Sequence, residues 1–134
     1  MEWINAPDDI TIKDVGFVYR IHELNTGMDY IGCKKFWRVV KYKPLKGKKN
    51  RRIKYIESDW REYNSSNKEI QKKIQEWPEN YHKIMLSTFG SVADMKAYEA
   101  YLQLQRYFNG EWNTLYNEVI NLRMRIRKGD TNEK

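Results

Sequence analysis

The chain has 134 residues and a formal net charge of +7, with 40% hydrophobic and 14% aromatic residues. That length fits one compact domain with its own core, and the chain lacks the run of about 18 apolar residues that would cross a membrane. Cys33 is the one cysteine, which excludes an intramolecular disulfide, and the first residues lack the pattern of a secretory signal, so a cytoplasmic protein is expected.

A β-hairpin is predicted near the start of the chain, after a lead-in over residues 1–15. Residues 16–24 are rich in β-branched and aromatic side chains, residues 25–27 (Asn-Thr-Gly) supply a turn, and residues 28–33 are again extended. Because side chains alternate across a strand, one face of the first strand is expected to hold Phe17, Tyr19 and Ile21.

A basic run follows the hairpin. Residues 34–54 contain eleven Lys or Arg residues and no acid, so the net charge of the remaining chain is −4. Residues 41–50 are expected to form an exposed loop that returns in a short strand at 51–57. Such a local positive field favours nucleic acid or an acidic membrane as the partner over a small substrate, and a solvated loop is the alternative. The residues expected to bind DNA are Lys34, Arg38, Lys41, Lys43, Lys48, Lys49, Arg51 and Arg52.

A helix is predicted after residue 66. Ser66 and Glu69 match a capping box, Ile70, Ile74 and Trp77 form an apolar stripe, and Pro78 ends the helix. A third strand is expected over residues 81–89.

Two further helices are predicted in the last third of the chain. Ser91 is expected to cap a helix that runs to about Phe108, and the apolar pattern over residues 112–126 suggests a final helix before a polar tail at 128–134. The expected fold is therefore α+β, with a small antiparallel β-sheet packed against helices. It forms a single domain over residues 16–127, with the basic run 34–54 as an insertion.

Two tripeptides carry a resemblance to a known family. Phe17-Val18-Tyr19 and Tyr30-Ile31-Gly32 resemble the two halves of the GIY-YIG nuclease signature, with their tyrosines eleven positions apart. The first half departs from the pattern, since Phe17 stands where the family usually has glycine. With Ser65-Ser66, the third strand and a helix that contains one glutamate, the resemblance covers residues 16–117. It is strongest to small nucleases encoded by tailed phages.

The resemblance implies a DNA endonuclease that depends on Mg²⁺ or Mn²⁺. It suggests Tyr19 as the base, Tyr30 as its partner near the scissile phosphate, and Glu99 as the metal ligand. Glu99 is also the only acid between Met95 and Gly110, on a helix that is otherwise mostly apolar, which favours a cation beside it. The alternative is an exposed glutamate paired with Lys96 or Arg106.

The remaining site residues are less determined by the sequence. The family usually has an arginine that binds the phosphate, and here Lys34, Lys35, Arg38 and Arg61 compete, with Lys35 and Arg61 favoured. Asn117 resembles the family's late asparagine that supports the metal site, and an ordinary position on a helix surface is the alternative.

Two other functions are compatible with the sequence. The chain can be a non-catalytic basic module that binds DNA or RNA and keeps only the fold, or a basic structural protein for RNA or an assembly. Since no separate DNA-recognition domain is visible, a nuclease would take its specificity from the basic loop, a homodimer partner or an accessory protein.

Overall fold

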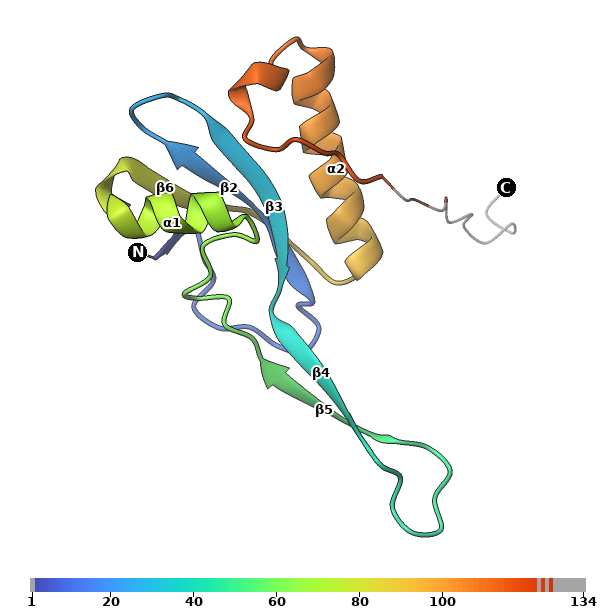
Figure 1. Ribbon diagram of the computed structural model, residues 1–134. Helices are drawn as coiled ribbons and strands as arrows, with labels where there is room; N and C mark the ends of the chain where they lie inside the picture. The colour runs from blue at the N-terminus through green and yellow to red at the C-terminus, as the bar shows by residue number, and fades with distance from the viewer. Residues whose placement is uncertain (1, 123, 125, 127–134) are drawn as a thin grey trace.

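The computed structural model describes residues 2–122, 124 and 126, and it contains a four-stranded sheet, a separate two-stranded ribbon and two α-helices (Figure 1). The strands of the larger sheet lie in the order β1-β6-β2-β3, and the ribbon is β4-β5. This arrangement confirms the α+β prediction. The elements are β1 (Trp3–Ile4), β2 (Gly16–Glu23), β3 (Asp29–Lys35), β4 (Trp37–Tyr42), β5 (Arg52–Glu57), α1 (Lys68–Glu76), β6 (Tyr81–Phe89) and α2 (Val92–Phe108), with short 3₁₀ turns η1 (Pro78–Asn80) and η2 (Trp112–Thr114).

The predicted hairpin is formed by β2 and β3, which pair antiparallel from Gly16↔Lys35 to His22↔Asp29. Gly27 in the turn has φ +75°, a conformation that glycine adopts without strain. β2 is the central strand, because β6 pairs with its other edge. The tyrosine-bearing strands therefore form the middle and one edge of the sheet.

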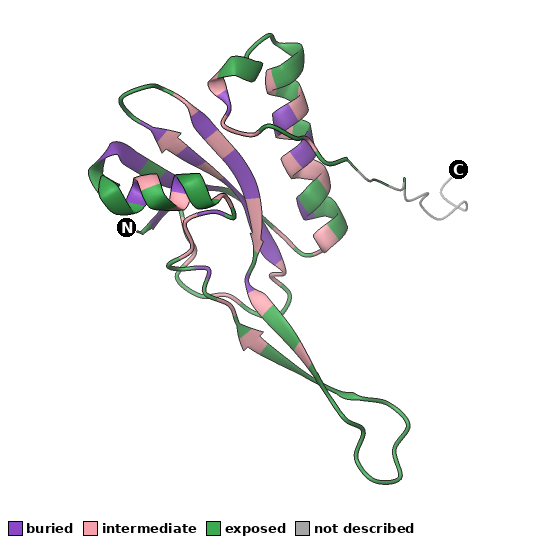
Figure 2. Ribbon diagram, viewed as in Figure 1, coloured by how far each residue is buried: buried purple, intermediate pink, exposed green. Residues whose placement is uncertain are grey.

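The sheet separates two hydrophobic cores, and α1 and α2 lie on opposite sides of it (Figures 1 and 2). The first core joins the predicted apolar face of β2 to α1 through Ile70 and Ile74. The second joins Val18 and Ile31 to Met95 of α2. Alternation along β2 and β3 decides which helix each side chain meets.

The segment 1–15, expected to be only a lead-in, contributes a strand to the sheet. β1 pairs with β6 in parallel, so the sheet is mixed and not purely antiparallel. Trp3 is buried, and its indole N–H donates to the carbonyl oxygen of Trp60 over 2.6 Å. A buried tryptophan with a satisfied N–H anchors this segment to the first core.

The helix caps match the prediction at α2 and differ at α1. Ser91 accepts from the backbone N–H of Asp94, as expected for the N-cap of α2. At α1 the cap is Asn67, whose side chain accepts from the backbone N–H groups of Glu69 and Ile70, so the prediction of Ser66 was wrong. Trp77 is 52% exposed and follows the helix, so it does not complete the buried stripe.

The basic run forms a ribbon that extends away from the sheet (Figure 1). The predicted returning strand is β5, but its partner β4 was not predicted, because residues 34–42 read as part of a basic insertion. Only residues 43–51 connect the two strands as a loop. Cross-strand hydrogen bonding, which a single strand's sequence does not reveal, holds β4 in place.

The predicted final helix over residues 112–126 is not formed in its described part. Only η2 is helical, and Leu115 then makes a parallel bridge with Asp29 at the open edge of β3. The backbone N–H of Tyr116 donates to the carbonyl oxygen of Asp29 over 2.8 Å. A segment that pairs with the edge of β3 satisfies backbone groups of that strand. A helix over these residues would leave those groups of β3 without partners, so the extended conformation is favoured. The polar tail lies outside the described residues.

No helix in the described part of the chain is long and apolar enough to cross a membrane.

Candidate active site

The two signature tyrosines face each other across the hairpin. The ring centroids of Tyr19 on β2 and Tyr30 on β3 are 6.2 Å apart, and the rings are inclined by 30°. Gly32 lies directly opposite Tyr19 in the register, and a Cβ atom there would be 2.6 Å from the Cζ of Tyr19. The glycine of the second tripeptide is therefore required because the Tyr19 ring occupies the space of any larger side chain.

Tyr19 is fully buried, at 0% exposure. Burial raises its pKa well above the usual value of a phenol, and the neighbouring Tyr63 and Tyr30 raise it further. The Tyr63 ring lies edge-on at 6.1 Å. Among the described residues, none gives the Tyr19 hydroxyl a hydrogen bond of ordinary geometry, so this buried polar atom is left unsatisfied.

Tyr30 is more accessible than Tyr19. Its hydroxyl is 3.1 Å from the Oγ of Ser66, in the loop before α1. Tyr30 and Asn117 also line an open cavity of about 390 Å³, together with the carboxylate residues Glu69 and Glu118. Ser66 is thus a partner of the tyrosine pair, a role that the capping-box interpretation missed. The adjacent serines in the sequence were the one signal that could have indicated it.

Glu99 projects from α2 and lies beside Cys33 on β3. The Cys33 thiol donates to Oε1 of Glu99 over 3.7 Å. Burial raises the pKa of the Glu99 carboxyl, and burial with the nearby Glu99 charge raises the pKa of Cys33 to about 12. Cys33 therefore stays a thiol at neutral pH. As a hydrogen-bond donor, the thiol orients the Glu99 carboxylate.

The alternative in which Glu99 pairs with Arg106 does not occur. Arg106 instead binds Asp29, with 2.7 Å between Nη2 and Oδ2, and this pair ties the end of α2 to the start of β3. Lys96 is close enough to lower the pKa of Glu99, but burial outweighs it. Glu99 is thus a half-buried carboxylate without a strong cationic partner among the described residues.

The Tyr30 side chain and Glu99 lie on opposite faces of β3. Tyr30 and Gly32 alternate with Cys33 along the strand, so Tyr30 and Gly32 face the α1 core while Cys33 faces α2. β3 is the last strand of the sheet, and residues 115–117 contact its edge at Asp29 and Ile31. The resemblance implies that the tyrosines and Glu99 act on the same phosphate. The structure places the tyrosine pair on the α1 side of β3, and Glu99 lies beside Cys33 on the α2 side.

A cavity of about 610 Å³ lies next to the Glu99 side of β3. It is bordered by four cationic residues, namely Lys34, Lys35, Arg38 and Lys96, together with Cys33. Of the two favoured phosphate-binding candidates, Lys35 lies here. Such a cluster of cations can bind a phosphate of the DNA backbone.

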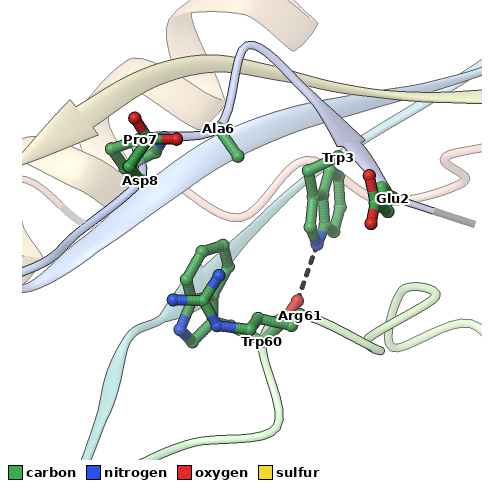
Figure 3. Close-up of a pocket in the computed structure, with 7 residues that line it drawn as sticks. All are labelled: Glu2, Trp3, Ala6, Pro7, Asp8, Trp60 and Arg61. Atoms are coloured by element: carbon green, nitrogen blue, oxygen red, sulfur yellow. Dashed lines mark hydrogen bonds between the residues drawn. The ribbon is translucent and has the colours of Figure 1, made fainter.

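Arg61, the other favoured candidate, lies in a different hollow. This pocket of about 280 Å³ is formed by the N-terminal segment and residues 60–61 (Figure 3). The guanidinium carbon of Arg61 is 4.3 Å from the Trp60 ring centroid, and its Nε is 3.4 Å from Oε2 of Glu57. Arg61 and Lys35 therefore do not share a pocket.

The surroundings of Glu99 are compatible with a hard divalent ion. The described residues contain no group of three or more His, Cys, Asp or Glu that could hold a metal together. A single carboxylate is compatible with Mg²⁺ or Mn²⁺, which retains several waters and takes further ligands from substrate phosphate. The protonated thiol of Cys33 argues against a soft, thiolate-bound metal.

Asn117 does not lie on a helix surface, and its side chain contacts the backbone of β3. Its side-chain amide accepts from the backbone N–H of Ile31 over 2.9 Å and donates to the carbonyl oxygen of Ile31 over 2.8 Å. The Asn117 amide thus forms the two backbone hydrogen bonds at Ile31 that a neighbouring strand would otherwise form. Because Ile31 follows Tyr30, this pair holds the tyrosine strand in position.

The predicted DNA-binding residues lie mostly along the ribbon. Lys34 is the exception, because its ammonium is 2.8 Å from Asp59 and 4.3 Å above the Tyr63 ring at the base of the ribbon. The others are exposed on β4, on β5 and in the intervening loop; they are Arg38, Lys41, Lys43, Lys48, Lys49, Arg51 and Arg52.

The structure has the features that define the class of GIY-YIG nuclease domains. They are a hairpin with facing tyrosines, an α+β sheet and a helix that presents one glutamate. The family model described as putative endonuclease segE, GIY-YIG domain, matches residues 3–120. The chain belongs to this family, and the match begins at β1 and extends past Asn117. Comparison with curated proteins and with solved structures gives no match. Membership implies endonuclease activity, with DNA as the substrate.

Proposed function

We propose that the protein is a metal-dependent endonuclease that hydrolyses phosphodiester bonds in DNA. The observation that carries this proposal is the packing of Tyr19 against Tyr30 over Gly32, within a chain that matches the nuclease family from residue 3 to residue 120.

Tyr19 is proposed as the general base. Hydrolysis requires a group that takes a proton from the attacking water. The unsatisfied hydroxyl of Tyr19 can accept a hydrogen bond from that water once the Tyr63 or Tyr30 side chain moves aside. Its raised pKa means that little phenolate exists at neutral pH, so the cleavage rate should increase with pH. Tyr30 is the proposed partner that faces the phosphate.

Glu99 is proposed to hold Mg²⁺ or Mn²⁺. When bound, the ion offsets negative charge on the phosphoryl oxygens. The thiol of Cys33 orients the carboxylate towards β3. Because Tyr30 and Glu99 lie on opposite faces of β3, the scissile phosphate is proposed to cross the edge of this strand beyond Ile31, past the contacts that Leu115 and Asn117 make with it.

Lys35 is the stronger candidate for the phosphate-binding cation, because it lines the cavity on the Glu99 side of β3. Arg61 remains a second candidate that would reach DNA from the N-terminal side. Asn117 acts on the site through Ile31, by holding the strand that carries Tyr30. It is therefore proposed as a positioning residue.

The test is cleavage of plasmid DNA with and without Mg²⁺. The wild-type protein should nick plasmid only with the metal. Glu99→Gln and Tyr19→Phe should each lower the rate by about a hundredfold or more, while DNA binding stays within about twofold. The exposed residue Glu79 lies on η1, and Glu79→Gln serves as the control for charge.

Wild-type protein that binds DNA but cuts none of several substrates in Mg²⁺ or Mn²⁺ would overturn the proposal. It would instead support the second candidate, a non-catalytic DNA-binding module. The complete burial of Tyr19 is the observation that favours this alternative.

A partner for specificity, either a second copy or an accessory protein, is also proposed. The outer surface of α2 offers a place for it, since Tyr101, Leu104 and Phe108 line a mostly apolar hollow with Leu122 and Met124.

A further inference from the structure

The β4-β5 ribbon contributes little to the core of the domain. Its twelve strand residues are exposed or half-buried, and none is buried (Figure 2). Trp37, at the base, is the one ribbon strand residue packed against the first core. Side chains that the fold does not need are available for contact with another molecule.

The two faces of the ribbon differ in charge. Directly paired residues share a face, and the pairs alternate between faces along the ribbon. We name the face that contains Arg38, Arg52 and Lys54 the arginine face, and it has no acidic residue. The opposite face carries Glu57 and one cation, Lys41. The complete arginine face is Arg38, Val40, Tyr42, Arg52, Lys54 and Ile56.

The arginine face continues into the cavity beside Glu99. Arg38 and Val40 line that cavity together with Lys35 and Lys96, and Trp37 and Val39 of the opposite face line it as well. A polyanion that lies along the arginine face therefore reaches the metal side of the proposed active site. At the other end, the loop 43–51 adds five cations beyond the strands.

We propose that the ribbon is an arm that inserts its arginine face into the major groove of duplex DNA. The inference rests on the proposed function for the identity of the partner as DNA, and it adds the groove and the contacting surface. A six-residue strand spans about 20 Å, and the major groove, about 12 Å wide, admits a two-stranded ribbon. Arginine side chains on such a face can contact the acceptor edge of guanine.

Other nucleic-acid surfaces fit the ribbon less well. The minor groove of B-DNA is about 6 Å wide, which is too narrow for two strands. The major groove of duplex RNA is deep and narrow, so side chains cannot read it. The ribbon thus predicts a preference for duplex DNA over duplex RNA and over single strands.

The experiment measures binding of the full chain, without divalent metal, to a duplex of about three helical turns. One form of the duplex carries 5-(biotinylaminoallyl)deoxyuridine in place of thymidine, which blocks the major groove. A second form is saturated with netropsin, which blocks the minor groove. The expected result is a loss of affinity of about tenfold or more for the first form and less than about twofold for the second.

Matched variants assign the effect to the arginine face. Arg52→Gln with Lys54→Gln should weaken binding and remove the sensitivity to the bulky major-groove group. Lys68→Gln with Lys72→Gln removes the same charge from exposed positions of α1 and should keep that sensitivity. Thermal unfolding of both variants checks that the fold is retained.

Three outcomes would overturn the inference: greater sensitivity to netropsin, equal effects of the two double variants, or equal affinity for duplex RNA. Plasmid cleavage in Mg²⁺ is measured on the same samples. If the protein cuts DNA but its binding does not depend on an open major groove, only the ribbon inference is contradicted. If binding depends on the major groove but no DNA is cut, only the proposed endonuclease is contradicted.

Discussion

Lys83 on β6 is fully buried in the first core, at 0% exposure. Its Nζ donates to Oδ1 of Asn64 over 3.0 Å and lies 4.5 Å from the centroid of the Trp3 ring. Burial lowers its pKa to about 8, and the charge of Glu62 only partly opposes this. A lysine that loses much of its hydration without a close carboxylate is a source of instability at neutral pH.

We therefore predict that Lys83→Met stabilises the protein by about 1–3 kcal/mol at neutral pH. Below pH 8 the lysine is protonated in both the folded and the unfolded state, so the cost of burial is fully present. Between the lowered pKa of about 8 and the ordinary value of 10.5, the folded state loses its proton first, and the wild type gains stability as the pH rises. Urea unfolding of both proteins across this range measures the difference.

The advantage of the methionine variant should shrink as the pH rises. A variant less stable than wild type, or an advantage that does not change with pH, would contradict this account of Lys83.

At the scale of the elements, the edge of β3 is closed by a chain segment and not by a strand. Leu115 bridges Asp29, and the Asn117 amide forms two hydrogen bonds with the backbone of Ile31. The Gln103 side chain donates to the same Ile31 carbonyl over 3.0 Å, which links α2 to this edge. The strand that carries Tyr30 is thus held by two parts of the chain, the segment 115–117 and α2.

We predict that Asn117→Ala destabilises the protein by about 1–3 kcal/mol, because the buried N–H of Ile31 loses its partner. Hydrogen exchange of the Ile31 amide should become faster, and both effects should appear without metal. Glu118→Ala, at the neighbouring position, is the control. An Asn117→Ala protein with unchanged stability in the absence of metal would instead favour a direct role at the metal.

At the scale of the whole molecule, α1 and α2 cover opposite faces of the sheet, and the half-buried Glu99 on α2 lowers the stability of the folded state. Because burial raises its pKa, its charged form is disfavoured in the folded protein. The free energy of unfolding therefore increases as the pH falls through the raised pKa of Glu99. A cation bound to the carboxylate would stabilise the charged form and offset the cost of burial.

We predict that Glu99→Gln has a higher Tm than wild type without metal at neutral pH. Mg²⁺ or Mn²⁺ should raise the Tm of wild type, because a hundredfold excess of the ion over Kd adds about 2.7 kcal/mol to the free energy of unfolding. The Tm of Glu99→Gln should not change when the metal is added. Glu79→Gln should respond to metal as wild type does. Equal metal-induced shifts in all three proteins would remove Glu99 as the ligand.

Local features of the chain were predictable because they depend on near neighbours in the sequence. The β2-β3 hairpin follows from alternation and the Asn-Thr-Gly turn, and α2 follows from the cap at Ser91. The spacing of Tyr19 and Tyr30 is itself a property of the hairpin, so the pair and the family were recognisable from the order of the amino acids.

The features that the sequence missed all depend on partners distant in the chain. β1 is held by its pairing with β6 and by Trp3, whose ring packs against Phe17 and whose N–H donates to the Trp60 carbonyl oxygen, and β4 is held by its pairing with β5. Leu115 is extended and bridges Asp29 at the edge of β3, although the apolar spacing of residues 112–126 suits a helix.

The sequence alone determined the class of fold, the tyrosine hairpin and the concentration of positive charge, because turns, alternation and local charge act over a few residues. Tertiary structure alone decided that Tyr19 is buried, that Glu99 meets Cys33 on the other face of β3, and that the basic run is a two-faced ribbon. Which groups become desolvated and which face one another depends on strand order and register, and these arise only when distant segments pair.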